Sequence, residues 1–186
     1  MFVVFALLLC VKPALGQTRP IISEVFQSAV TIQITTGVGA DAVSSEGAGQ
    51  MSFDQPAGKA REFYAFGEGA PTEIITRYDL GQIFHFNRPT CEIETVTGSM
   101  PLFWDWVANA KQGAGMVVHG KPYATWVSLD SATQEVKTVA ATNDGTRPVF
   151  YEARTPEGSV SITFLSWQTT VKPKPDLFDP PEQCSE

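Results

Sequence analysis

Apolar and polar residues alternate along much of this chain with a period of two. In residues 26–34, FQSAVTIQI, the even positions are mostly apolar and the odd positions mostly polar. Successive side chains of a strand point to opposite faces of a sheet, so this pattern predicts a strand with one buried face. Comparable runs cover residues 50–54, 59–66, 72–79, 82–87, 115–119, 123–129, 135–141, 148–154 and 159–169.

Turn sequences separate these runs and indicate how the strands connect. Gln55-Pro56-Ala57-Gly58 and Asp79-Leu80-Gly81 lie between predicted strands, and Asn143-Asp144-Gly145 and Pro156-Glu157-Gly158 follow later in the chain. Glycine and proline at such positions are typical of turns between antiparallel strands. We therefore expect a mainly β protein built on a single curved antiparallel sheet of about ten strands.

One segment has the period of a helix. Ser99 is a suitable N-cap, Pro101 suits a first turn and Gly113 suits a stop. Between them, apolar residues are spaced like one face of a helix: Leu102, Phe103, Trp106, Val107 and Ala110. The pattern predicts one amphipathic helix over Pro101–Lys111, packed on the sheet between its two halves.

The first sixteen residues have the composition of a secretory signal peptide. An apolar run from Phe2 to Val11 is followed by Ala14-Leu15-Gly16, whose small residues suit a cleavage site. The apolar run is too short to span a membrane, and no later stretch is long enough. We expect a signal peptide over 1–16, an exported β domain over 17–171 and a proline-rich tail over 172–186.

The cysteines support export and predict one disulfide. Cys10 leaves with the signal peptide, which turns three cysteines into two, Cys91 and Cys184. In an oxidising compartment a single bridge between them is expected. That bridge would hold the tail as a strap across the fold. The alternative is a free tail whose cysteine forms intermolecular disulfides.

Several landmarks along the chain resemble secreted ependymin-related proteins and their LolA-like relatives. They are Phe53-Asp54, Lys59-Ala60-Arg61, Tyr78-Asp79 with Gly81, Cys91, and the closing run from Pro175 to Cys184, PDLFDPPEQC. The resemblance implies a curved antiparallel half-barrel with a hydrophobic pocket on its concave side. Ependymin-like proteins usually carry more cysteines, so the broader LolA-like group fits better. The calcium binding described for ependymins is not carried over.

The charged and nucleophilic residues do not assemble into a recognisable catalytic motif. Without residues 1–16 the chain has twelve basic and twenty acidic residues, a net charge of −8, which does not suit binding to nucleic acid. His85 and His119 lack metal-ligand spacing, and there is no Gly-x-Ser-x-Gly motif. We expect no enzyme activity, metal or cofactor; a carboxylate pair for glycoside hydrolysis stays open, because its spacing is invisible in sequence.

The abundance of aromatic residues points instead to binding. Phe103-Trp104-Asp105-Trp106 places three rings within four residues, and residues 59–66 carry rings on both strand faces. Core packing accounts for many such rings, but one sheet with one helix fills its concave side poorly. We expect a hydrophobic small molecule or lipid there, lined by Phe63, Phe84, Phe86, Phe103, Trp106, Trp126 and Phe164. The alternative is an extracellular adhesion protein whose same face binds a protein or matrix partner.

Overall fold

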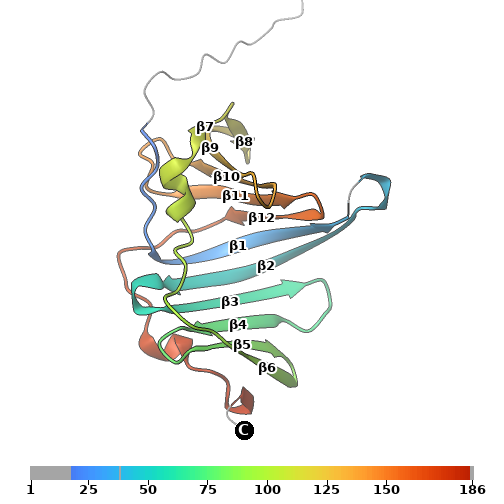
Figure 1. Cartoon of the computed structure of the whole chain (residues 1–186), viewed down its shortest axis with the longest axis vertical. Helices are drawn as coiled ribbons and strands as arrows, with labels where there is room; N and C mark the ends of the chain where they lie inside the picture. Colours follow the sequence, from blue (N-terminus) through green and yellow to red (C-terminus); the bar gives the residue numbers. More distant parts are fainter. Residues whose placement is uncertain (1–17, 38, 185–186) are drawn as a thin grey trace, which may run out of the picture.

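The computed structural model describes residues 18–37 and 39–184, which form one large antiparallel sheet (Figure 1). Its strands are β1 (Val25–Thr36), β2 (Val43–Asp54), β3 (Lys59–Phe66), β4 (Thr72–Arg77), β5 (Gln82–Asn87), β6 (Thr90–Thr95), β7 (Lys111–Gln112), β8 (Met116–Val118), β9 (Lys121–Asp130), β10 (Glu135–Ala141), β11 (Pro148–Thr155) and β12 (Gly158–Phe164). The expected signal peptide, Met1–Gly16, lies outside the described residues. No helix in the described ranges is long and apolar enough to cross a membrane.

The sheet consists of two meanders, which are joined where the first strand of the chain, β1, pairs with the last, β12. The strand order is β6-β5-β4-β3-β2-β1-β12-β11-β10-β9-β7, and β8 pairs with β9. Strands β1 and β12 meet in the middle, where Val30 lies opposite Phe164. The prediction of a mainly β fold with a single antiparallel sheet is confirmed.

The strand limits agree with the sequence where alternation is strong. Lys59–Phe66, Gln82–Asn87 and Glu135–Ala141 are strands with the expected bounds. β2 begins seven residues before the predicted start at Gln50, because its first half is rich in serine, glycine and alanine and carries little apolar signal. β6 was not predicted, since most of its residues are exposed and no buried face marks it.

The predicted helix over Pro101–Lys111 is wrong. The segment contains only a short 3-10 helix, η3 (Asp105–Asn109), whose N-cap residue Trp104 makes no capping hydrogen bond from its side chain. Successive residues of an α-helix are about 100° apart around its axis, so Phe103, Trp104 and Trp106 could not all face one sheet. An irregular backbone allows them to do so, and these tertiary contacts override the helical spacing.

Residues 96–110 form what we call the crossover segment, which connects β6 at one edge to β7 at the other. Figure 1 shows this segment running across the strands on one side of the sheet. It contacts the sheet mainly through rings, with centroid separations of 5.7 Å for Phe103–Phe53, 5.9 Å for Trp104–Phe164 and 6.1 Å for Trp106–Tyr151. Trp104 is 4% exposed, so its ring is part of the core.

The main core lies between the crossover segment and the face of the sheet that we call the core face. Its buried members include Phe26, Val30, Met51, Phe53, Tyr64, Trp126, Val139, Ile162 and Phe164. They occupy paired positions of neighbouring strands, as in the row Ile32–Ile162–Tyr151–Val139–Trp126. Side chains paired in this way lie on the same side of an antiparallel sheet, which explains why one face is continuously apolar.

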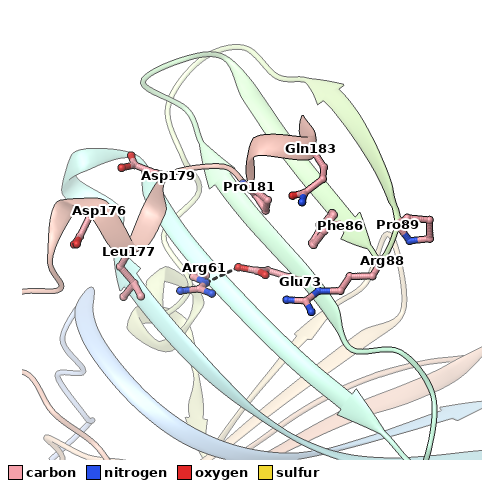
Figure 2. A pocket seen from close by; sticks show the side chains of 10 residues that line it. All are labelled: Arg61, Glu73, Phe86, Arg88, Pro89, Asp176, Leu177, Asp179, Pro181 and Gln183. Carbon is pink, nitrogen blue, oxygen red and sulfur yellow. Dashed lines mark hydrogen bonds and ion pairs between the residues drawn. The ribbon is translucent and has the colours of Figure 1, made fainter. Parts of the chain in front are cut away.

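A second, smaller core lies on the opposite side of β4 and β5, which we call the strap face. Ile75, Phe84 and Phe86 are buried there with Cys184. The covering element is the C-terminal strap (residues 172–184), with the 3-10 helices η4 (Pro175–Phe178) and η5 (Glu182–Cys184). Figure 2 shows these helices lying over the strands. The proline-rich composition prevents regular structure but not packing, and Phe178 is 1% exposed.

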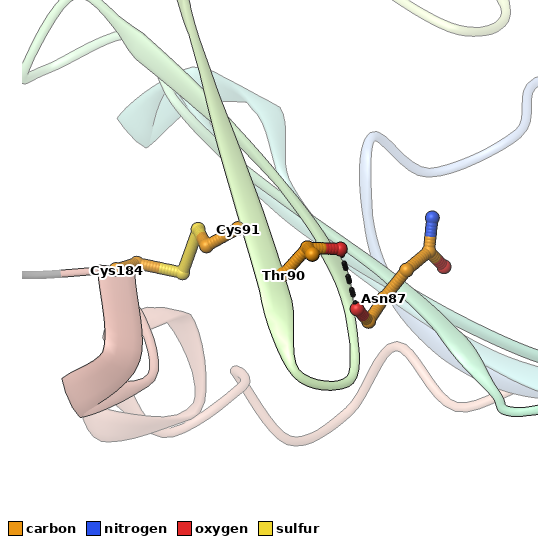
Figure 3. Close-up of a disulfide and its surroundings, with 4 residues drawn as sticks. All are labelled: Asn87, Thr90, Cys91 and Cys184. Atoms are coloured by element: carbon orange, nitrogen blue, oxygen red, sulfur yellow. Dashed lines mark hydrogen bonds between the residues drawn. A yellow bond between two sulfur atoms is a disulfide. The ribbon is translucent and has the colours of Figure 1, made fainter.

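The strap is fixed at its end by the predicted disulfide (Figure 3). Cys91 of β6 is bonded to Cys184 across a sequence separation of 93 residues, with a Cα–Cα distance of 5.4 Å. Next to Cys91, the Thr90 hydroxyl donates to the carbonyl of Asn87 at 2.7 Å and closes the β5–β6 turn. The intramolecular bridge is confirmed, and such bridges are typical of proteins in oxidising compartments.

Candidate ligand-binding site

The seven residues predicted to line a pocket are divided between the two faces of the sheet. Trp126 and Phe164 lie on the core face, and Phe103 and Trp106 of the crossover segment pack against them from above. Phe84 and Phe86 belong to the second core under the strap. Phe63 also lies on the strap face, next to Leu177. The sheet therefore brings four of the seven rings together and separates the other three from them.

Register explains this division. In each strand either the odd-numbered or the even-numbered residues are apolar. The sequence does not show which of these sets in one strand lies on the same face of the sheet as which set in another strand. Phe86 pairs with Glu73, which pairs with Phe63, and all three face the strap. In the same strand, β3, Tyr64 has the opposite parity and is buried in the main core. Only the pairing of all intervening strands determines these faces.

Beyond the crossover segment the core face carries an apolar area that is incompletely covered, which we call the shelf. Ile34, Val160 and Ala153 form one row across β1, β12 and β11. Phe66 lies one row nearer the crossover segment, paired with Gly47 of β2. All four side chains pack against the main core but remain partly exposed. The shelf thus extends the buried aromatic core to the protein surface.

Two glycines of β2 shape the floor beside the shelf. A Cβ atom at Gly47 would lie 2.8 Å from Cδ1 of Phe66, and one at Gly49 would lie 2.6 Å from Cδ1 of Tyr64. Real Cβ atoms do not approach other atoms so closely, so the absence of side chains here lets both rings lie over the β2 strand. The β2 backbone at these glycines therefore carries no side chains of its own, and the rings of Phe66 and Tyr64 lie on it next to the shelf.

One carboxyl group is placed within this largely apolar face. Glu62 of β3 accepts a hydrogen bond from the Tyr64 hydroxyl at 2.5 Å. Burial raises the pKa of Glu62, although the hydrogen bond from Tyr64 opposes this shift. Burial and the neighbouring carboxylate of Glu62 raise the pKa of Tyr64. The pair satisfies two polar groups internally and keeps the remaining surface apolar. The i, i+2 spacing on a strand could have revealed this pair in the sequence.

Few polar bonds attach the crossover segment to the rest of the protein. Gln55 Nε2 donates to the carbonyl of Pro101 at 2.7 Å, and Arg19 Nη1 donates to that of Ala108 at 2.5 Å. Glu24 lies near Asp105 of the segment, and its Oε2 atom is buried without a hydrogen-bond partner. Burial raises the pKa of Glu24 to about 7, and repulsion from Asp105 is the second, smaller cause of this shift. Ionisation of Glu24 is therefore unfavourable in the folded protein.

We predict that the protein becomes less stable as the pH rises from about 5 to 8. Glu24 has a folded-state pKa of about 7 against an ordinary 4.5, so its contribution is fully present below 4.5 and is lost as the pH passes 7. A shift of this size corresponds to at most about 3 kcal/mol, and solvent around the partly exposed side chain reduces it to about 1–2 kcal/mol. Melting temperatures measured from pH 5 to 8 check the slope.

Glu24→Gln should remove the part of this slope that comes from Glu24 and stabilise the protein at pH 8, while the raised pKa of Glu62 keeps a contribution of the same sign in the variant. Glu68→Gln, at an exposed position in the turn after β3, is the control and should keep the wild-type slope. A Glu24→Gln variant with an unchanged pH dependence would show that Glu24 is ionised at no cost in the folded protein.

The described residues contain no group of three or more histidine, cysteine, aspartate or glutamate side chains that could hold a metal ion. His85 lies on β5, where its Nε2 atom is 3.4 Å from Glu94 Oε2. His119 lies in the turn between β8 and β9 with a φ of 48°. The described residues of the core face offer mainly apolar contact, together with the Glu62–Tyr64 pair and the Glu24 carboxyl beside the crossover segment.

Comparison with known proteins gives structural similarities only. No family model and no curated protein matches the chain. The Mycobacterium tuberculosis lipoprotein LppX is similar with a TM-score of 0.46 and 13% identity, over 80% of this chain and 89% of that one. A putative outer membrane lipoprotein-sorting protein domain from Vibrio parahaemolyticus follows with 0.42 and 10%, over 84% and 90%. A LolA superfamily protein from Nitrosomonas europaea has 0.38 and 10%, over 87% and 93%.

One of these similar structures is a LolA superfamily protein. The link to ependymin-related proteins is not shown by them. The site described above is therefore defined by this chain's own geometry: a sheet with one apolar face, an irregular segment across it and a partly open shelf beside that segment.

Proposed function

We propose that the protein is a secreted, non-catalytic carrier that holds a lipophilic ligand on the core face, between the shelf and the crossover segment. The observation that carries this proposal is the shelf itself. Apolar side chains of four strands continue the core beyond the crossover segment and stay partly exposed there. Apolar surface that is continuous with a core and open at one side suits a lipid or another uncharged lipophile.

The crossover segment is suited to move for such a ligand. It has a single 3-10 turn, and its backbone is held to the rest of the protein by side-chain bonds from Gln55 and Arg19 and by the bond from Val96 N–H to the carbonyl of Gly81. Segments with little regular hydrogen bonding open at lower free energy than the sheet beneath them. A ligand bound on the shelf would contact Trp106, which lies over Tyr151, and would replace solvent along this edge.

We predict saturable binding of the uncharged fluorescent lipophile Nile red, measured by direct excitation of the dye. Trp106→Ala should weaken binding about tenfold, because it removes the ring at the boundary between the segment and the shelf. The matched control is Phe150→Ala, which removes a partly buried ring of β11 that lies on the opposite face, among Thr31, Ser161 and Thr163. It should leave binding unchanged.

Lipid extraction of natively purified protein, followed by mass spectrometry, identifies the cargo. Recovery of a lipid in near-stoichiometric amount supports the carrier proposal. Absence of lipid, together with absence of Nile red binding by a folded protein, would contradict it and would favour the adhesion alternative, in which the same apolar shelf binds a protein or matrix partner.

A further inference from the structure

A groove on the strap face has no role in the proposed carrier function. It has a volume of about 600 Å³ and lies between the C-terminal strap and strands β3 to β5 (Figure 2). The sheet separates it from the core face, since its buried ring, Phe86, belongs to the second core. Its volume lies in the range of small-molecule sites, which is about 300–1,000 Å³.

The floor of the groove carries an excess of positive charge. Glu73, whose side chain is 12% exposed, accepts a hydrogen bond from Arg61 Nε at 2.6 Å. Figure 2 shows Glu73 between the guanidinium groups of Arg61 and Arg88. Among the described residues, the terminal nitrogens of Arg61 and the whole guanidinium of Arg88 have no hydrogen-bond or ion-pair partner. Two cations thus flank one carboxylate, which leaves one positive charge.

The C-terminal strap forms the opposite wall and is held in place. It contributes two apolar side chains, Leu177 and Pro181, together with Asp176, Asp179 and Gln183, and Pro89 adds an apolar ring next to Arg88. The strap that carries Leu177 and Pro181 is fixed by buried Phe178 and by the disulfide at Cys184. A fixed wall reduces the entropy that a ligand must overcome on binding, so the groove is organised before a ligand arrives.

Two strap carboxylates at the rim do not cancel the charge on the floor. Asp179 Oδ1 lies 3.6 Å from Arg77 Nη1, while Arg77 is also paired with Asp79 at 2.8 Å and Asp79 with Lys59 at 3.5 Å, so these two carboxylates and two cations balance one another. Asp176 is exposed, and Figure 2 shows it at the end of the groove far from Arg88. An anion near Arg88 therefore meets the guanidinium groups first.

We propose that this groove binds a small organic anion with an apolar body. The anionic group accepts hydrogen bonds from Arg88 and from the terminal nitrogens of Arg61, because planar guanidinium forks match carboxylate and phosphate oxygens. The apolar body lies against Leu177 and Pro181. This site is independent of the lipophile site.

Binding of 3-phenylpropionate, measured by isothermal titration calorimetry, tests the proposal. We expect saturable binding that weakens with salt, about tenfold weaker binding by Arg88→Gln, and partial retention by Arg88→Lys. Phenethyl phosphate shows whether the site prefers a phosphate to a carboxylate, and the uncharged 3-phenylpropionamide should bind at least about tenfold more weakly than the acid. Arg154→Gln, at an exposed arginine of β11 paired with Glu152, should bind like the wild type.

Equal binding of the acid and the amide, or wild-type affinity in Arg88→Gln, would overturn the proposal, as would absence of saturation at millimolar concentrations. Nile red binding separates this site from the carrier site: Arg88→Gln should bind the dye like the wild type. Arg88 is exposed and without a partner, so its replacement should leave the melting temperature unchanged.

Discussion

Replacing Cys184 by serine is expected to destabilise the protein by about 4–5 kcal/mol, and to lower its melting temperature by about 10 °C. The bridge to Cys91 spans 93 residues, and closing a loop of this length removes much conformational entropy from the unfolded chain. The loss should also expose the second core, because Cys184 is 6% exposed and packs with Ile75, Phe84 and Phe86. Thermal and urea unfolding measure the change in stability.

The effect should be confined to the strap and the strands beneath it at low denaturant. Hydrogen exchange should accelerate in residues 172–184 and in β6, and less in β1 and β12. The double variant Cys91→Ser/Cys184→Ser is the matched control and should behave like the single variant, since both lack the same bond. A loss of less than about 1 kcal/mol would mean that contacts of the strap, including those of Phe178, hold it without the bridge.

Replacing Trp104 by alanine should cost about 3–5 kcal/mol, the range for removing a fully buried large ring. Trp104 contacts Tyr151, Phe164 and Trp167 at centroid separations of 5.9, 5.9 and 6.4 Å. Its removal leaves a cavity in the middle of the core face and takes away the main contact between the crossover segment and the sheet. Urea unfolding followed by circular dichroism measures the loss.

Trp104→Phe tests the contribution of the apolar ring to stability apart from that of the indole nitrogen. The indole Nε1 atom is buried without a hydrogen-bond partner, so phenylalanine keeps most of the apolar contact and removes an unsatisfied donor. We expect it to cost far less than Trp104→Ala. Leu102→Ala, at a neighbouring position that is 44% exposed, should change stability by less than about 0.5 kcal/mol. Equal losses for the alanine and phenylalanine variants would contradict this account.

The sequence was sufficient for the fold class because alternation is a local signal. Residues 59–66 and 135–141 show their strand period without reference to any other part of the chain. The helix prediction failed for the opposite reason. Apolar spacing in residues 101–111 resembles a helix, but the rings of this segment pack against rings of β2, β11 and β12, which are distant in sequence, and these contacts decide its conformation.

The candidate site was only partly predictable for a related reason. Trp126 on β9 and Phe164 on β12 share a face through three strand pairings, and none of these pairings can be read from either strand alone. Phe84 and Phe86 have the same aromatic signal but face the strap. The shelf depends further on Gly47 and Gly49, whose role is the space that they leave beneath the rings of Phe66 and Tyr64.

The pairing of β1 with β12 has a consequence for how the chain folds. Most other ladders join strands that are consecutive in sequence and can form early as hairpins. The β1–β12 ladder joins residues as distant as Val30 and Phe164, so its closure carries a large loop entropy and comes late. Until then each half of the sheet has an open strand edge. Two molecules that meet in this state can pair β1 of one with β12 of the other, which makes exchanged dimers the misassembly that this topology favours.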